Sequence, residues 1–398
     1  MSAKVIRDPI HGDIFLSELE LRIIDTPEFQ RLRRIKQLGM TYLVYPSANH
    51  TRFEHSIGAL HLAGRLASRL RLSEEETALV RIASLLHDLG HGPLSHTSEE
   101  LLARYLNTSH ESITTETIKN SSVADVLEEG DISPDRIVDV ISGEAGYLSR
   151  MVSGEFDIDR MDYLVRDAHH TGVCYGIIDL DRLINTIEIK DNLLVVNERG
   201  LRAVEGLLVA RFLMIPTVYL HHASRIADAM FLKATEVAIE QGELNFKELI
   251  KMDDYQVMSF FRTAQGYVKE IGERFDQRRL FKKALVKGWH DLSPSLRERI
   301  LGLRQDVRRM SRIETELAED AGVDYGYVLL DVPPEPSYRE LDALISQDEK
   351  VKRIEEVSPL VGVLKVAQKS HWSLGIYAPK EYLERVKRVA ANLESYVD

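Results

Sequence analysis

Half of the histidines in this 398-residue chain lie in one short stretch. Seven of the 14 fall between residues 50 and 110, where an even spread would place about two. The seven are His50, His55, His61, His87, His91, His96 and His110. Because imidazole nitrogens bind metal ions and exchange protons near neutral pH, this stretch is a candidate for chemistry.

Carboxylates accompany these histidines. Asp88 directly follows His87 at the end of an apolar helix, and His55 stands at the start of the preceding helix. Asp159 lies in a later acidic run, residues 156–163. Two imidazoles and two carboxylates make a mixed nitrogen and oxygen site, which suits a divalent cation with open positions for water and phosphate oxygens. Mg, Mn, Fe, Ni and Zn all remain open as the metal.

Helices must position these side chains. Aromatic residues are only 7% of the chain, so the core rests on Leu, Ile, Val and Ala, a mixture that favours a mainly α fold. After a short N-terminal β segment, helical spacing predicts helices at about 28–38, 56–70, 74–86, 97–106, 111–119, 134–142, 158–168, 201–213 and 217–241. Strand-like runs at 325–332, 361–364 and 372–377 predict a small C-terminal α+β lobe.

Composition also limits the classes of partner. The net charge of −12 argues against broad nucleic-acid binding, although a local basic pocket for a small polyanion remains open. The single cysteine, Cys174, excludes an intrachain disulfide and a Cys-rich zinc site. No run of about 18 apolar residues predicts a membrane span, and the N-terminal segment lacks an apolar signal core. We therefore expect a cytoplasmic protein.

Several long motifs carry a resemblance to a known family. They are DPIHG (8–12), IIDTPEFQRLRRIKQLG (23–39), RFEHSIG (52–58), HDLGHGPLSH (87–96) and FDIDRMDYLVRDAHHTG (156–172). In this order they resemble the deoxynucleoside triphosphate triphosphohydrolases of the HD-domain superfamily, over roughly residues 4–235. The resemblance implies an HD-domain helical bundle in residues 1–240. Beyond it, the residue pattern predicts a charged helical region at 241–320 and the α+β lobe at 321–398.

The resemblance implies hydrolysis of a deoxynucleoside triphosphate (dNTP) to a deoxynucleoside and inorganic triphosphate. It makes His55, His87, Asp88 and Asp159 the metal ligands. It also makes His110 the catalytic histidine, oriented by Glu99 where close relatives have the shorter Asp, and it places His91 and His96 beside the phosphates. The alternative for each of these residues is a purely structural role in the core or in a loop, with its polar atoms hydrogen-bonded within the protein.

Substrate-binding roles are carried over in the same way. The positions that match phosphate, sugar and base contacts are Arg52, Gln37, Leu38, Arg160, Tyr163, Asp167, Arg211 and Tyr219. Arg160 stands where relatives carry a Lys, so the charge is kept and the geometry of the donor differs. Without the resemblance, Arg52 would be an ion-pairing residue and Leu38 part of the core.

A regulatory site is also implied. Positions matching a guanine nucleotide site between subunits are Lys4, Val5, Asp25, Gln30 and Arg33. A neighbouring deoxynucleotide activator site is matched by Val44, Tyr45 and His221. GTP, dGTP or a dNTP would be the activator, and the chain would form a homodimer or homotetramer. The alternative for the basic segment is a solvated helix face.

Two other functions remain open. The chain could be an HD phosphohydrolase that acts on another nucleotide or phosphoester, or a nucleotide sensor without catalysis. The sugar-contact set favours the dNTP enzyme over the first alternative. The presence of all four matching metal ligands argues against the second.

Overall fold

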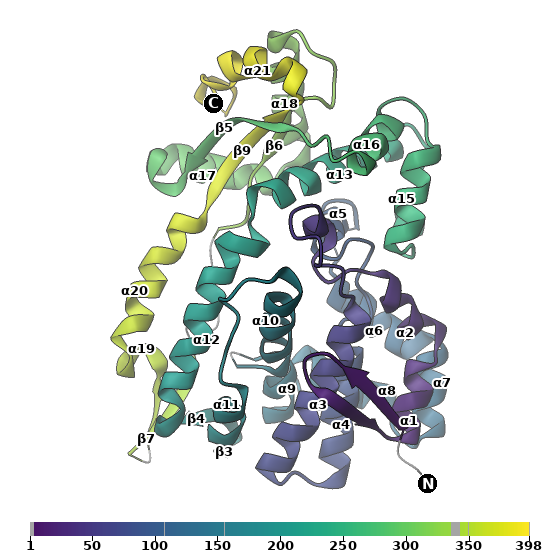
Figure 1. Ribbon diagram of the computed structural model, residues 1–398, viewed down its shortest axis with the longest axis vertical. Helices are drawn as coiled ribbons and strands as arrows, with labels where there is room; N and C mark the ends of the chain where they lie inside the picture. Colours follow the sequence, from purple (N-terminus) through teal and green to yellow (C-terminus); the bar gives the residue numbers. More distant parts are fainter. Residues whose placement is uncertain (1–3, 107, 155, 336–342, 349, 398) are drawn as a thin grey trace. The chain divides into compact units, whose positions relative to one another are not determined.

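The computed structural model describes all residues except 1–3, 107, 155, 336–342, 349 and 398 (Figure 1). The chain forms two compact units. The first comprises Met1–Glu99, Thr108–Met214 and Tyr338–Lys365, and the second comprises Glu100–Asn107, Ile215–Ser337 and Val366–Asp398. Helices dominate the described residues, which confirms the mainly α fold. The division at residues 240 and 320 stays a prediction.

Three helices form the centre of the first unit: α3 (Arg52–Leu70), α4 (Glu74–Leu86) and α10 (Ile158–Thr171). Helix α3 packs against both others and buries Ile57 and Leu60. It begins four residues earlier than predicted, because the Glu54 carboxylate accepts hydrogen bonds from the backbone and hydroxyl of Thr51 and caps the first turn. Arg52 and His55 therefore lie on the first turns of this helix.

The predicted helix 28–38 is wrong beyond its first turns. Helix α2 covers Pro27–Arg31 and a single 3₁₀ turn, η1, covers Leu32–Arg34. The backbone then becomes extended at Ile35, whose carbonyl accepts from the Arg52 amide at 2.9 Å. The backbone amide of Gln37 donates to the backbone carbonyl of His50 at 3.0 Å. Pairing with residues 50–52 thus replaces the helix and brings Gln37 beside the start of α3.

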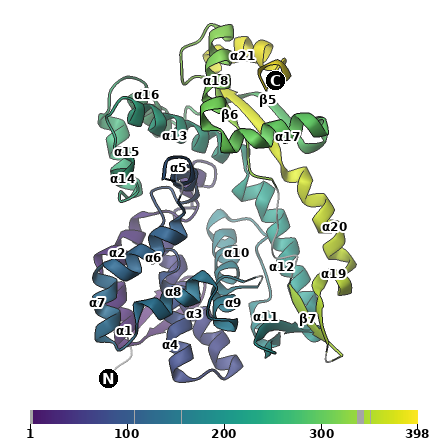
Figure 2. The ribbon, with the colours of Figure 1, turned by 180° about the vertical axis from the view of Figure 1, so that it is seen from behind.

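A tight turn follows α4. Gly90 donates from its amide to the Thr114 hydroxyl at 2.9 Å, and a Cβ at position 90 would collide with the backbone of α6 (His110–Asn120). Leu94 and Ser95 have left-handed backbone angles, with φ of 57° and 52°. This close approach of α6 positions its first residue, His110. Helices α6, α7 (Ser122–Glu129) and α8 (Pro134–Ser142) are seen from behind in Figure 2.

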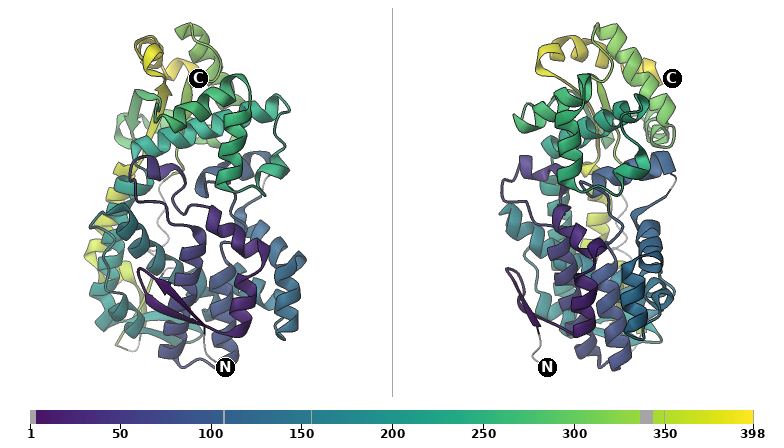
Figure 3. Two further views of the ribbon diagram at one scale, coloured as in Figure 1. Left: turned by 45° about the vertical axis from the view of Figure 1, so that its right-hand side comes forward. Right: turned by 90° about the vertical axis from the view of Figure 1, so that its right-hand side faces the viewer.

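Two small sheets complete the first unit. The N-terminal hairpin pairs β1 (Lys4–Asp8) with β2 (Gly12–Leu16), which confirms the predicted β segment (Figure 3). Ile14 and Leu16 are buried, whereas Phe15 is exposed. The second sheet has the order β3-β4-β7-β8, with β3 (Ile187–Lys190), β4 (Leu193–Asn197), β7 (Leu344–Gln347) and β8 (Lys350–Arg353). Residues near 350 are thus part of the first unit.

The second unit has its own core. Its sheet has the strand order β5-β9-β6, formed by β5 (Lys282–Gly288), β6 (Leu329–Asp331) and β9 (Ser373–Ala378). The helices of this unit include α13 (His222–Glu240), α18 (Val307–Ala321) and α21 (Leu383–Ala390). Trp372, Leu317 and Val386 belong to its hydrophobic core. Two of the three predicted strands are present; the first is shortened by a left-handed turn at Gly326.

The third predicted strand, 361–364, is wrong. These residues lie in helix α20 (Pro359–Ala367), where Val361 and Leu364 are buried and Val363 and Val366 are exposed. The buried pair is spaced by three residues, so these apolar residues form the buried face of a helix.

No single helix in the described part of the chain is long and apolar enough to cross a membrane, although one bent pair of consecutive helices has the length and composition to do so.

Gly58 of α3 provides the space that α10 occupies, because a Cβ there would overlap the Asp162 and Arg166 side chains. We expect Gly58→Ala to lower the free energy of unfolding by about 1–3 kcal/mol through overpacking. The matched control is Gly206→Ala, at an exposed helical glycine with nothing within 4 Å of the added methyl group. This change should be neutral or stabilise by up to about 1 kcal/mol. Urea unfolding followed by circular dichroism compares the two, and an equal effect would refute this steric account.

Candidate active site

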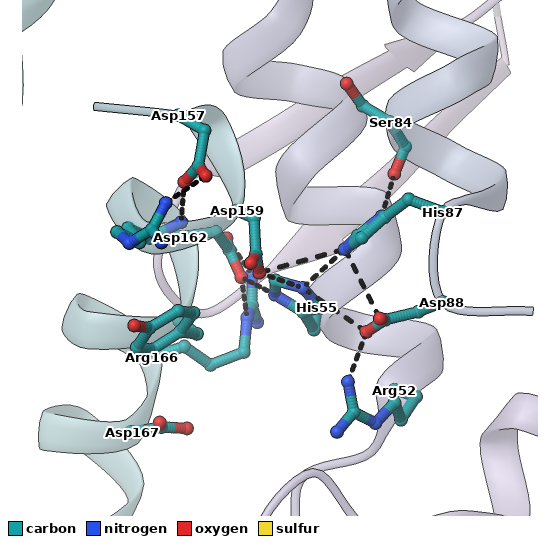
Figure 4. A network of polar contacts seen from close by, with 12 residues as sticks. Arg52, His55, Ser84, His87, Asp88, Asp157, Asp159, Asp162, Arg166 and Asp167 are labelled. Carbon is teal, nitrogen blue, oxygen red and sulfur yellow. Dashed lines mark hydrogen bonds and ion pairs between the residues drawn. The ribbon is translucent and has the colours of Figure 1, made fainter. Parts of the chain in front are cut away.

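Four predicted metal ligands converge in the first unit (Figure 4). The Nε2 atom of His55 lies 3.0 Å from Asp159 Oδ1, 3.4 Å from His87 Nε2 and 3.6 Å from Asp88 Oδ2. The Nε2 atom of His87 lies 3.5 Å from Asp88 Oδ1 and 3.7 Å from Asp159 Oδ1. Helices α3 and α10 and the C-terminal end of α4 therefore bring ligand atoms of His55, His87 and Asp159 to within 4.8 Å of one another, with Asp88 beside the two histidines.

The donor set fits a divalent cation. Donor atoms that share one first-row cation at about 2.1 Å lie about 3.0–3.5 Å from one another, close to the spacing observed here. The two imidazoles are also in the required tautomer. His55 donates from Nδ1 to Asp162 Oδ2 at 2.8 Å, and His87 donates from Nδ1 to the Ser84 carbonyl at 2.8 Å. With its proton on Nδ1, the neutral form of each ring directs the Nε2 lone pair towards the other donors.

The charges of the site are strongly coupled. Burial favours the neutral form of His55, but hydrogen bonds with Asp159 and Asp162 raise its pKa to about 10. Burial alone would raise the pKa of Asp88, yet Arg52 and His87 hold it well below its usual range. A proton or a cation is therefore held firmly between these carboxylates and imidazoles.

Arg52 is anchored beside the four donors. Its guanidinium pairs with Asp88 and donates from Nε to the Ser95 hydroxyl at 2.9 Å. The exposed residue His96 places Nε2 3.4 Å from Arg52 Nη2. A cationic group next to the metal ligands is suitably placed for a phosphate, and that role stays a prediction.

A second group of side chains lies next to Asp88. One ligand atom from each of Asp88, His91 and His110 lies within 4.8 Å of the others. His91 Nε2 is 3.2 Å from Asp88 Oδ1, and its ring stacks on that of His110 with centroids 3.9 Å apart. His110 Nδ1 lies 2.9 Å from Glu99 Oε2. Burial alone would raise the pKa of Glu99, but its interactions with His110 lower it. The longer acid at position 99 therefore does reach the predicted catalytic histidine.

The predicted sugar contacts are partly brought together. The hydroxyl of Tyr163 accepts a hydrogen bond from Arg211, and both belong to the first unit. Asp167, one turn further along α10, pairs with His50 at 2.7 Å. Gln37 is buried, with no hydrogen-bond partner for its side-chain oxygen in the described structure. Leu38 is half-buried beside it in the chain.

Two further predicted substrate residues are Arg160 and Tyr219. The guanidinium of Arg160 pairs with Asp157, the N-cap of α10, and donates to the Gly154 carbonyl. These two contacts join it to the start of its own helix. Tyr219 belongs to the second unit.

The predicted regulatory residues lie on several different elements of the structure. Gln30 donates from its amide to the carbonyl of Ile24 at 2.8 Å and accepts from Arg33 Nε at 2.9 Å. Asp25 ends helix α1 (Glu18–Ile24) and contributes to the electrostatic environment of Arg33. Lys4 and Val5 are exposed on β1. Val44 and Tyr45 follow the 3₁₀ segment η2 (Gly39–Leu43), whereas His221 belongs to the second unit.

Four residues without an expected role lie in the network around the site: His11, His50, Asp162 and Arg166. His11 lies in the DPIHG motif, and Asp162 and Arg166 lie in the motif that carries Asp159. Their presence inside these motifs was the available signal. Only the fold shows that Asp162 contacts His11, which is 151 positions away.

Comparison with known proteins agrees with this geometry. The HD domain model matches residues 52–167, and the HD associated region model matches residues 178–394. The chain belongs to the HD phosphohydrolase family. The HD match begins at Arg52 and ends at Asp167, and so includes all four converging donors.

Relatives of this HD protein span several groups of organisms. An uncharacterised protein of Methanocaldococcus jannaschii is 40% identical over 388 residues, covering 96% of this chain and 81% of the relative. The deoxynucleoside triphosphate triphosphohydrolase SAMHD1 of Bos taurus is 34% identical over 282 residues, covering 58% of this chain and 48% of that enzyme. The chain thus spans about half the length of this relative. A phosphohydrolase structure from Bacteroides thetaiotaomicron matches with a TM-score of 0.75 and 25% identity, covering 95% of this chain and 100% of that one.

His87→Ala removes one predicted donor and leaves Asp88 and Asp159 without that partner. We expect the affinity for Mn²⁺ to fall by about 100-fold or more. Competition with a fluorescent chelator measures it on protein freed of metal by dialysis. His290→Ala, at an exposed histidine of the second unit, is the control and should bind Mn²⁺ like the unchanged protein. Equal affinities for the two variants would place the metal elsewhere.

Proposed function

We propose that this chain hydrolyses deoxynucleoside triphosphates to deoxynucleosides and inorganic triphosphate in a metal-dependent reaction. The observation that carries the proposal is the position of the His110–Glu99 pair near the predicted metal ligands, because Asp88 lies 3.6 Å from His55 and 3.2 Å from His91, whose ring stacks on that of His110. The similarity to SAMHD1 over more than half of this chain supports the dNTP as substrate.

The cation is proposed to be held by His55, His87, Asp88 and Asp159. When bound, it supplies positive charge that polarises the phosphate undergoing attack. Arg52 is proposed to bind phosphate oxygens beside it, since a guanidinium matches a phosphate with paired donors. His91 and His96 would line the same side.

His110 is the proposed proton donor. Its Nδ1 lies 2.9 Å from Glu99 Oε2, and a proton on Nδ1 would leave Nε2 as the nitrogen that faces the leaving group. As water forms its bond to the α-phosphorus, the bond from phosphorus to the 5′-oxygen breaks. Protonated His110 gives its proton to that oxygen, which leaves as the deoxynucleoside. The oxygen of the water becomes part of the triphosphate, and the proton that the water loses restores His110.

The remaining substrate contacts are proposed from α10 and its neighbours. The Tyr163 hydroxyl and the Asp167 carboxylate are suited to a 3′-hydroxyl, and a tyrosine ring beneath C2′ would exclude a ribose 2′-hydroxyl. Arg160, Arg211 and Tyr219 remain proposed phosphate and sugar contacts, and Gln37 and Leu38 remain proposed contacts near the sugar and base.

Regulation is proposed to follow the same family pattern. Asp25, Gln30 and Arg33 would read a guanine nucleotide together with Lys4 and Val5, in a homo-oligomer located in the cytoplasm. Val44, Tyr45 and His221 would contact a deoxynucleotide activator.

Product identity tests the proposed reaction. The protein loaded with Mn²⁺ is incubated with each dNTP, alone and with GTP or dGTP, and the products are separated by ion exchange. We expect a deoxynucleoside and intact triphosphate, and no turnover with His87→Ala. Pyrophosphate or orthophosphate as product would instead identify a different phosphohydrolase, and the absence of turnover under every condition would favour a nucleotide sensor.

The proton donor is tested by a pair of substitutions. We expect His110→Ala to lower kcat by about 10²–10⁴-fold, because general acid catalysis contributes that much. Glu99→Gln keeps the shape and removes the charge that orients the ring, so a smaller loss is expected. Mn²⁺ affinity, measured in parallel, should change far less than for His87→Ala. A kcat for His110→Ala close to that of the unchanged enzyme would exclude the role.

A further inference from the structure

The turn of the N-terminal hairpin is hydrogen-bonded to the carboxylate that orients a metal ligand. Asp162 accepts from His55 Nδ1 at 2.8 Å through Oδ2 and from His11 Nε2 at 2.7 Å through Oδ1. His55 is on α3 and Asp162 is on α10, while His11 stands between β1 and β2. We propose that His11 and Asp8 are positioning residues that set the metal affinity of His55 through Asp162.

Both oxygens of the Asp162 carboxylate are fully used as hydrogen-bond acceptors. Arg166 donates to both of its oxygens, from Nε at 2.8 Å and from Nη2 at 2.9 Å, so each oxygen receives two hydrogen bonds. The side chains of Asp162 and Arg166 are fully buried, and that of His11 is 3% exposed. Because Arg166 donates to both oxygens, the carboxylate acts as an acceptor, and each histidine must donate to it.

This requirement fixes the metal-binding nitrogen. With the proton of a neutral His55 on Nδ1, the lone pair lies on Nε2, the atom that faces His87, Asp88 and Asp159. Carboxylates that hold a ligating histidine in this way raise its basicity and fix its ring, and their loss typically costs 10–100-fold in metal affinity or activity. Any residue that moves the Asp162 carboxylate therefore also moves the Nε2 atom of His55.

Asp8 gives the hairpin a second connection to the same point. Its Oδ2 accepts from Arg166 Nη1 at 2.9 Å, and its Oδ1 accepts from the amides of Ile10 and His11 at 2.8 Å. The carboxylate thus shapes the turn that presents His11 and also holds Arg166 against Asp162. A hairpin of only two strands is marginally stable by itself, so these buried bonds also fix the hairpin on the unit.

The absence of a side chain on α3 makes room for the arrangement. A Cβ on Gly58 would overlap Asp162 and Arg166. Gly58 lies one turn after His55, so the helix that carries the ligand also receives the carboxylate that orients it. His61, one further turn along, stacks on His11 with ring centroids 5.2 Å apart.

The inference rests on cation binding at His55 and not on the identity of the substrate. Its test is therefore a metal measurement, which stays informative if dNTP hydrolysis is refuted. Mn²⁺ affinity is measured by chelator competition on metal-free protein, and the visible absorption of the Co²⁺-loaded protein reports the ligand field. Circular dichroism and thermal unfolding establish that each variant is folded.

His11→Phe keeps a ring against His61 and removes the donor to Asp162. We expect it to weaken Mn²⁺ binding by about 10-fold or more and to shift the Co²⁺ absorption. His11→Gln places an amide N–H near the position of Nε2, so it should restore most of the affinity. The same loss in both variants would show that packing, and not the hydrogen bond, matters.

His50→Phe is the matched control. His50 Nε2 also lies 2.7 Å from a buried carboxylate of α10, Asp167, and its ring also stacks on a histidine, His170. The hydrogen bond of His50 is made to Asp167, whereas the Nδ1 atom of the ligand His55 is hydrogen-bonded to Asp162. The Mn²⁺ affinity of this control should therefore stay within about twofold of the unchanged protein. A loss equal to that of His11→Phe would overturn the proposal.

Asp8→Asn provides an independent test if His11→Phe does not fold. An amide nitrogen in place of Oδ2 faces the Arg166 donors and weakens the hold on Asp162, while the retained oxygen still caps the turn. We expect weaker Mn²⁺ binding, between the His11→Phe and unchanged values. An unaltered affinity in this folded variant would refute the connection through Asp8.

Discussion

The buried Asp162 carboxylate is the interaction on which the arrangement of the site depends. It joins α10 to α3 through His55 and both helices to the hairpin through His11. A carboxylate in this position is costly to bury unless every lone pair is used, and four donated hydrogen bonds meet that cost. Since removing one partner would leave charge unpaired in the core, the network favours a single arrangement of these three elements.

The same device is repeated around the site. A histidine held by a carboxylate occurs at His110 with Glu99 and at His50 with Asp167, as well as around Asp162. At a metal ligand the carboxylate fixes which nitrogen has the lone pair, and at a proton donor it fixes which nitrogen exchanges. One physical arrangement can thus prepare imidazoles for different tasks, and the task is decided by what lies at the other nitrogen.

The predictable part of this protein was the part encoded locally. Helical periodicity located α4, α6, α8 and α10, because their apolar faces recur with the helix period. The short helix at Pro27–Arg31 was overestimated because the backbone pairing between residues 35–37 and 50–52 is not visible in the periodicity. The strand expected at 361–364 was a helix for a related reason: β-branched residues suit a strand, and packing of Val361 and Leu364 on one face overrode that preference.

The site divides in the same way. Residue types and motif order predict four metal ligands, and the structure brings His55, His87 and Asp159 together with Asp88 beside the histidines. The partner of each ligand could not be read from the sequence, because Asp162 and His11 are 151 positions apart and meet only through the fold. Gly58 illustrates the limit best: in the sequence it is a poor helix former within α3, whereas in the fold it is the space that Asp162 and Arg166 occupy. Residues that act by orienting others are therefore identified from contacts, since their own chemistry is ordinary and their effect lies in the atom they hold in place.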